Sequence, residues 1–219
     1  MDSTVVFENT PKATVDSFLD ELSFEFTDAP YGLLEHYIRR VVMDMCERAN
    51  ILRRVAHIHT QSNIHNYLLE PPDDVHVIAI MSVALGHHVF VPAKFARTNV
   101  PVWECDCSCL GHGMNFIHCN GAEINFTHPH SGDDWIVNMS VKPKPDACEF
   151  DTSLLYDYAP TVIDGVRAEL YGQSDKPWSS VQRAALAEQA YKSGCATIAV
   201  DRMLNGQRGT FRAKRGRAF

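Results

Sequence analysis

The spacing of the apolar residues changes twice along the chain, and this change most limits the folds open to it. Apolar residues recur every three or four positions from Leu34 to Met45, alternate with polar residues over much of 52–141, and return to helical spacing after Asp151. Apolar residues with the helical period line one face of a helix, and those with the strand period line one face of a strand, so one pattern does not suit the other element. The sequence therefore predicts helices in both terminal parts and strands between them.

Two helices are expected on each side of the strand region. Residues 15–22 form one apolar face of a first helix, and a second runs from about Tyr31 to Ala49. A third carries the apolar face of residues 155–170 and ends at Gly172, a suitable C-terminal cap. A fourth, from about Ser179 to Leu204, is rich in small residues and can approach a partner helix closely.

Strands are expected over most of the middle of the chain, with Gly, Pro, Asn and Asp between them. The candidate segments are 52–60, 75–85, 88–91, 102–109, 114–119, 123–127 and 135–141. We therefore predict an α+β protein with three parts. Residues 1–50 and 151–205 form a helical bundle, residues 51–150 an inserted small antiparallel β sandwich or barrel, and residues 206–219 an extended basic C-terminal tail.

The composition bounds the class of protein. With 219 residues and 45% hydrophobic content, the chain can bury a real core. Its seven cysteines are an odd number in a chain too large to need disulfide staples, so a reducing cytoplasm fits better than secretion. No stretch approaches the roughly 18 apolar residues of a membrane helix. We expect a soluble, untargeted protein without a membrane partner.

The net charge of −7 conceals an uneven distribution. Residues 202–219 hold six basic and no acidic residues, which leaves 14 basic and 27 acidic residues elsewhere. A basic segment on an acidic body usually docks on an acidic partner, either another protein or a nucleic acid. The alternative is a solvated, disordered terminus.

A cysteine- and histidine-rich segment raises the question of zinc. Cys105, Cys107 and Cys109 alternate as in a strand, whereas structural zinc sites usually pair ligands as Cys-x2-Cys on a tight turn. We favour buried cysteines that act as small apolar residues, and no metal or other cofactor. The alternative is a zinc-containing nucleic-acid-binding protein that uses segment 105–119. Its metal ligands would come from Cys105, Cys107, Cys109, His112, His118 and Cys119.

The sequence offers residues for catalysis but no arrangement of them. The eleven histidines match no metalloprotease spacing, and the glycines match neither the dinucleotide-binding nor the P-loop pattern. The adjacent pairs Asp73–Asp74 and Asp133–Asp134 are explained by turn chemistry. A Cys/His nucleophile pair meets only in a fold, so it stays open at this point. We expect a protein that is not an enzyme.

Two regions carry a resemblance to a known family. The helix Tyr37-Ile-Arg-Arg-Val-Val-Met-Asp-Met-Cys-Glu-Arg48 is followed by a strand and then by Asn66-Tyr-Leu-Leu-Glu-Pro-Pro-Asp-Asp-Val-His-Val-Ile-Ala-Ile80. Later, Gly172-Gln-Ser-Asp-Lys-Pro-Trp178 joins two helices before an Arg-rich end. In this order the chain resembles the head-to-tail connector or adaptor proteins of tailed, especially short-tailed, bacteriophages. Residues 103–130 fall outside the resemblance.

The resemblance implies a structural subunit of the virion neck, assembled in the host cytoplasm. Such subunits form a ring, typically of twelve copies, beneath the portal of the filled capsid, and they offer a platform for the tail tube or nozzle. Genomic DNA passes through without sequence-specific binding, which suits an acidic ring. In that family the C-terminal tail inserts into the portal. The matching docking residues here are Arg208, Phe211, Arg212, Lys214, Arg215, Arg217 and Phe219.

Overall fold

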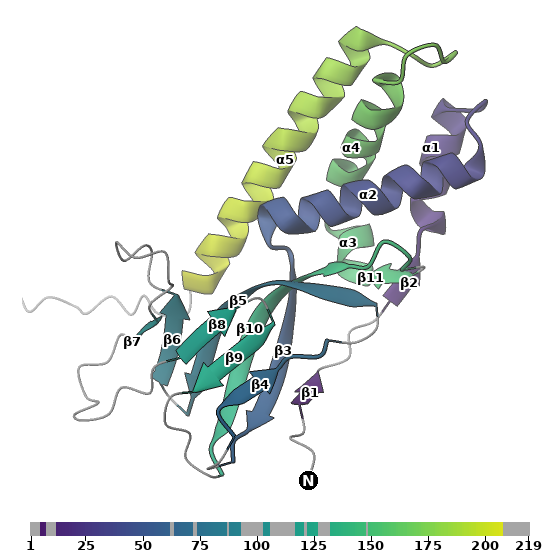
Figure 1. Ribbon diagram of the computed structural model, residues 1–219. Helices are drawn as coiled ribbons and strands as arrows, with labels where there is room; N and C mark the ends of the chain where they lie inside the picture. The colour runs from purple at the N-terminus through teal and green to yellow at the C-terminus, as the bar shows by residue number, and fades with distance from the viewer. Residues whose placement is uncertain are drawn as a thin grey trace, which may run out of the picture. The chain divides into compact units, whose positions relative to one another are not determined.

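The computed structural model describes residues 5–7, 12–61, 64–71, 74–86, 88–92, 103–105, 117–120, 122–126, 132–147 and 149–207 (Figure 1). The fold mixes helices with small antiparallel sheets, in agreement with the α+β class. It divides into two compact units. The sheet unit takes its described residues from Met1–Val15 and Leu52–Leu155, and the helical unit from Asp16–Ile51 and Tyr156–Phe219.

The sheet unit contains three antiparallel sheets. Its strands are β1 (Val5–Phe7), β2 (Lys12–Thr14), β3 (Leu52–His59), β4 (Asn66–Leu68), β5 (Val75–Leu85), β6 (His88–Pro92), β7 (Trp103–Cys105), β8 (Ile117–Asn120), β9 (Glu123–Phe126), β10 (Asp134–Pro143) and β11 (Glu149–Asp151). The largest sheet has the order β1-β3-β10-β5-β6-β7. The others are β4-β9-β8 and β11-β2.

Alternation of side chains along the central strands builds the core of this unit. On β3 and β10 the paired residues Ile58 and Trp135 are buried, whereas the next pair along, His57 and Ile136, is exposed. A pleated strand turns successive side chains to opposite faces, so the buried set lies on one face of the sheet. The alternating pattern of residues 52–60 and 135–141 is thus confirmed as strands.

Aromatic rings join the three-stranded sheet to the six-stranded sheet. The ring centroid of Phe126 on β9 lies 4.8 Å from that of Trp135 on β10, and 5.7 Å from that of Tyr67 on β4. All three side chains are buried. Tilted and edge-on aromatic pairs at these separations add to the gain from burying apolar surface.

A buried ion pair ties the two-stranded sheet to the large sheet. Arg54 occupies an inward position of β3, and its Nη2 donates to Oδ2 of Asp151 on β11 at 2.8 Å. Each side chain is only 6% exposed. A buried charge lowers the stability of the fold unless it is paired, so loss of either side chain would leave the other as an unpaired charge in the interior.

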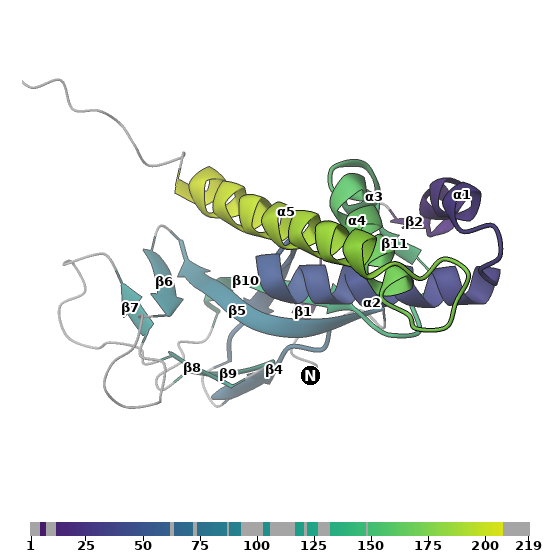
Figure 2. The same ribbon diagram turned by 90° about the horizontal axis from the view of Figure 1, so that it is seen from above.

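The helical unit contains α1 (Asp16–Glu25), α2 (Tyr31–Ala49), α4 (Ala159–Tyr171) and α5 (Val181–Gln207). The short helix α3 (Thr152–Tyr156) spans the boundary between the two units. In both views α4 lies between α5 and α1, and α2 crosses them (Figures 1 and 2). The core is apolar and comes from all four long helices, with α2 alone burying Leu34, Ile38, Val41, Val42, Met45, Cys46 and Ala49.

Two glycines set how closely these helices pack. A Cβ atom on Gly165 of α4 would lie 2.5 Å from Val41 Cγ1 and 2.9 Å from Tyr191 Cδ2. A Cβ atom on Gly194 of α5 would lie 2.7 Å from Thr161 Oγ1. The close approach of α5 to a partner helix, expected from its small residues, is therefore confirmed.

Two differences from the sequence prediction concern the parts of the chain that were assigned to helices. The helix expected to run on from about residue 151 is interrupted, because α3 ends at Tyr156 and α4 begins at Ala159. Pro160 lacks a backbone N–H and suits only a first helical turn, so it starts a new helix. Residues 5–7 and 12–14 form strands of the sheet unit, although residues 1–50 were assigned to the helices. Three-residue strands are too short to show a period.

Candidate functional site

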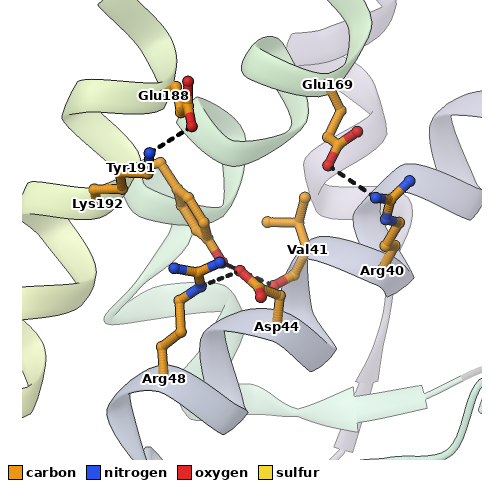
Figure 3. A network of polar contacts seen from close by, with 8 residues as sticks. All are labelled: Arg40, Val41, Asp44, Arg48, Glu169, Glu188, Tyr191 and Lys192. Atoms are coloured by element: carbon orange, nitrogen blue, oxygen red, sulfur yellow. Dashed lines mark hydrogen bonds and ion pairs between the residues drawn. The ribbon is translucent and has the colours of Figure 1, made fainter.

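A pocket of about 500 Å³ opens in the helical unit between α2, α4 and α5. Its lining includes the small residues Ala168 and Ala184, which leave the space that larger side chains would fill. Charged side chains surround that space, and Figure 3 shows how they lie. The six are Arg40, Asp44, Arg48, Glu169, Glu188 and Lys192.

Asp44 is the centre of the polar network in this pocket (Figure 3). The Tyr191 hydroxyl donates to Asp44 Oδ2 at 2.8 Å and also lies 3.3 Å from the carbonyl oxygen of Val41. Arg48 Nε donates to the same Asp44 oxygen at 2.6 Å. The network thus links α5 to α2 through one carboxylate.

The other charges of the pocket are paired as well. Arg40 Nη2 on α2 lies 3.5 Å from Glu169 Oε1 on α4. Lys192 forms an ion pair with Glu188, one turn earlier on α5. Three cations and three anions leave the lining without net charge. A site for phosphate or for a metal ion concentrates one sign of charge, so this lining suits neither.

Burial keeps the two titratable groups beside this network uncharged. It raises the pKa of Tyr191 far above its ordinary value, and the hydrogen bond to Asp44 raises it further. Burial also raises the pKa of the Cys195 thiol. A nucleophilic cysteine needs a lowered pKa, so Cys195 is placed as a packing residue. The polar contacts around the pocket join α2 to α4 and to α5.

The sheet unit holds its own polar pairs near strand ends. His59 Nδ1 lies 2.7 Å from Asp134 Oδ1, and Lys12 Nζ lies 3.0 Å from Asp74 Oδ2. Asp133 accepts from the backbone N–H of Thr60 through its carbonyl oxygen. Asp74 precedes β5, whereas Asp133 and Asp134 stand at the start of β10, which runs antiparallel to β5. The two predicted aspartate pairs therefore lie at opposite ends of this strand pair, and Asp74, Asp133 and Asp134 each serve local structure. Asp73 lies outside the described residues.

The proposed zinc ligands that the structure describes belong to two different sheets. Cys105 ends β7 of the six-stranded sheet, whereas His118 and Cys119 lie on β8 of the three-stranded sheet. Cys107, Cys109 and His112 lie outside the described residues. Within the described ranges, no group of three or more His, Cys, Asp or Glu side chains is placed to hold a metal ion.

The predicted docking residues also lie beyond the described part of the chain. The structure describes the chain as far as Gln207 in α5. Arg208, Phe211, Arg212, Lys214, Arg215, Arg217 and Phe219 all follow it. Their docking role remains a prediction.

Sequence reasoning did not find the Asp44–Tyr191 network or the Arg54–Asp151 pair. One signal was present for the first: Asp44 and Arg48 are four residues apart, the spacing at which charges meet on a helix. A signal for the second was the arginine at an inward position of an alternating strand. Its partner is 97 residues away in sequence and could not be chosen without the fold.

None of the helices that the structure describes combines the length and the apolar character that a bilayer crossing requires. A scan against protein-family models and a search of curated proteins both find no match to the chain. The function of the chain is therefore inferred from its sequence and from the geometry of each unit.

Proposed function

We propose that the chain is a structural, non-enzymatic subunit of a tailed-bacteriophage neck, a head-to-tail adaptor that works as a ring beneath the portal. The observation that carries the proposal is the charge distribution: residues 202–219 hold six of the 20 basic residues and no acidic residue. The rest of the chain is strongly acidic. A basic segment with two phenylalanines suits insertion into an acidic groove of a partner protein.

The order of elements also supports this proposal. The helices α1 and α2, the strands β3 to β11 and the helices α4 and α5 follow one another in the order that resembles the adaptor family. In the proposal the four long helices act as one bundle and the sheets as an inserted sandwich or barrel. The contact of Phe126 with Trp135, which packs one sheet on another, supports the sandwich.

The remaining parts of the proposal concern partners. The basic segment docks on the portal, the ring presents a platform to the tail tube or nozzle, and genomic DNA passes through the ring without sequence-specific contacts. Assembly takes place in the host cytoplasm and the product is the virion neck. An acidic lining repels the phosphate backbone and so favours passage over binding.

Deletion of Gly209–Phe219 tests the docking role. The truncated chain should keep its far-ultraviolet circular dichroism and lose attachment to DNA-filled heads that lack necks, as measured by co-sedimentation and electron microscopy. A matched control replaces the three arginines of the deleted segment, Arg212, Arg215 and Arg217, with lysine, which keeps the charge. It should retain more attachment than the deletion.

Two results would contradict the proposal. Normal attachment of the truncated chain would show that the basic segment is not the anchor. Failure of the full chain to attach to heads, together with stoichiometric zinc in the same sample, would favour the nucleic-acid-binding alternative.

A further inference from the structure

The packed side of α5 ends in an arginine. Tyr191, Cys195 and Ile198 lie on this side at intervals of four and three residues, and each is at most 8% exposed. Arg202 takes the next position of the same stripe, four residues after Ile198, and its side chain is half-buried. Residues at this spacing share one face of a helix. Arg202 therefore lies on the side of α5 that packs within the helical unit.

Tyr158 is the residue that Arg202 meets there. Arg202 Nε donates to the Tyr158 hydroxyl oxygen at 3.2 Å. The guanidinium carbon of Arg202 also lies over the Tyr158 ring, 5.8 Å from its centroid. A cation within about 6 Å of the centroid is attracted by the electrons of an aromatic ring. One tyrosine therefore holds Arg202 in two ways.

The position of Tyr158 is fixed by helix α4. Tyr158 directly precedes Ala159, the first residue of α4. Its carbonyl oxygen accepts the backbone N–H of Val162 at 3.1 Å, the first hydrogen bond of the helix. The ring therefore moves with α4, and the contact with Arg202 joins the far part of α5 to the start of α4.

This contact lies at the end of the pair that α4 and α5 form. Gly194 of α5 packs against Thr161 of α4, and Arg202, further along α5, contacts Tyr158, which precedes α4. The two helices are therefore antiparallel, and α4 begins where Arg202 lies. Residues 203–207 continue α5 past this point. The contact is thus the attachment to the start of α4 that stands nearest to the basic end of the chain.

We propose that Arg202 is a positioning residue for the docking of the basic segment, and is not one of the residues that dock. Of the six basic residues in 202–219, five then remain to contact the portal. Arg202 and Tyr158 fix the direction of the last turns of α5, and with it the direction from which the basic segment starts. A segment whose direction is already fixed loses less freedom on binding, which raises its affinity. This inference deepens the adaptor proposal and rests on it.

A double-mutant cycle separates positioning from direct docking. Tyr158→Leu removes the ring and the hydroxyl without a change of charge, and Arg202→Gln removes the cation. Each should weaken attachment to DNA-filled heads that lack necks by about fivefold. The double variant should attach no more weakly than the worse single variant, because both changes break one contact. Arg202→Lys, which keeps a cation over the ring, should retain most of the attachment.

Two control variants match these changes. Arg183→Gln removes an equal charge and a similar contact, in which the guanidinium carbon lies 5.6 Å from the centroid of Tyr171, at the opposite end of α5. Tyr156→Leu removes a tyrosine that is 78% exposed, two residues before Tyr158. Both controls should attach as the wild type does. Co-sedimentation with heads over a series of chain concentrations measures the attachment of every variant.

Hydrogen exchange of the free chain gives a second measurement, which does not depend on heads. Tyr158→Leu and Arg202→Gln should each speed the exchange of the backbone amides of residues 199–207 by about fivefold or more, because the end of α5 opens more often. The amides of residues 184–192 should exchange as in the wild type. Circular dichroism of each variant checks that the helices are retained.

Three results overturn the positioning role. Normal attachment of Tyr158→Leu beside weak attachment of Arg202→Gln would mean that Arg202 contacts the partner directly. Normal attachment of both variants would mean that the contact does not affect docking. Unchanged exchange at residues 199–207 would mean that it does not hold the end of α5. A full chain that never attaches to heads overturns the adaptor function instead, and the exchange rates still decide whether Arg202 and Tyr158 fix the end of α5.

Discussion

Breaking the buried Arg54–Asp151 pair is the perturbation whose cost the structure defines best. Both side chains are 6% exposed and their charged atoms lie 2.8 Å apart. Asp151→Leu leaves the Arg54 guanidinium in the interior without its carboxylate. Removing one partner of a buried ion pair costs about 3–5 kcal/mol, because the remaining charge has lost both water and its partner. We expect the sheet unit of this variant to be less stable by that amount.

The double variant Arg54→Met/Asp151→Leu distinguishes pairing from packing. Replacing both charges with apolar side chains removes the desolvation cost together with the attraction, so its stability should lie within about 1 kcal/mol of the wild type or above it. The two single changes should therefore be strongly non-additive. A double variant as unstable as the worse single variant would mean that shape, and not charge, sets the cost.

Urea unfolding followed by tryptophan fluorescence measures these differences. The chain has three tryptophans, and Trp178→Phe leaves Trp103 and Trp135, so that only the sheet unit reports. The control is Lys12→Met, which breaks the partly exposed Lys12–Asp74 pair of the same unit and should cost less than about 1 kcal/mol. If Asp151→Leu costs no more than Lys12→Met, the reasoning from burial is wrong.

Two further predictions concern the helical unit. Gly165→Ala should destabilise it by about 1–3 kcal/mol in urea unfolding followed by the helical signal in far-ultraviolet circular dichroism, because the new methyl overlaps Val41 and Tyr191. Gly32→Ala, which meets no atom within 4 Å, should leave stability unchanged or raise it by up to about 1 kcal/mol, and equal effects of the two changes would contradict this account. The raised pKa of Tyr191 favours its protonated form in the folded state, so its contribution is complete below the ordinary tyrosine pKa of about 10 and is lost as pH rises above it. Tyr191→Phe should therefore show a shallower loss of stability from pH 9 upward in a series of urea titrations, and an unchanged slope would contradict the assigned cause.

The sequence was most informative where an element was long and one-sided. The helix over 31–49 and the strand over 75–85 were predicted with the bounds that the structure has, since each repeats its period several times. The three-residue strands β1, β2, β4 and β11 repeat no period, and their existence depends on partners far along the chain. Local pattern alone could not reveal them.

The candidate site was less predictable for the same physical reason. Asp44 and Arg48 share one helix turn, but Tyr191 joins them from almost 150 residues away, so only the packing of α5 on α2 creates the network. In the sequence Tyr191 reads as one more apolar residue of a helix face. The zinc hypothesis stays a prediction, because three of its candidate ligands, Cys107, Cys109 and His112, lie outside the described residues.

The division of the helical unit between two distant stretches also bears on how the chain folds during synthesis. Helix α2 leaves the ribosome early, yet the partners of its apolar face, α4 and α5, begin about a hundred residues later. At about 5–20 residues per second, that delay is about 5–20 s. The sheet unit, whose last strand is β11, is complete before α4 has been made. The helical unit is therefore begun before most of the sheet unit and finished last, and the apolar side of α2 must be protected from aggregation while the strands fold.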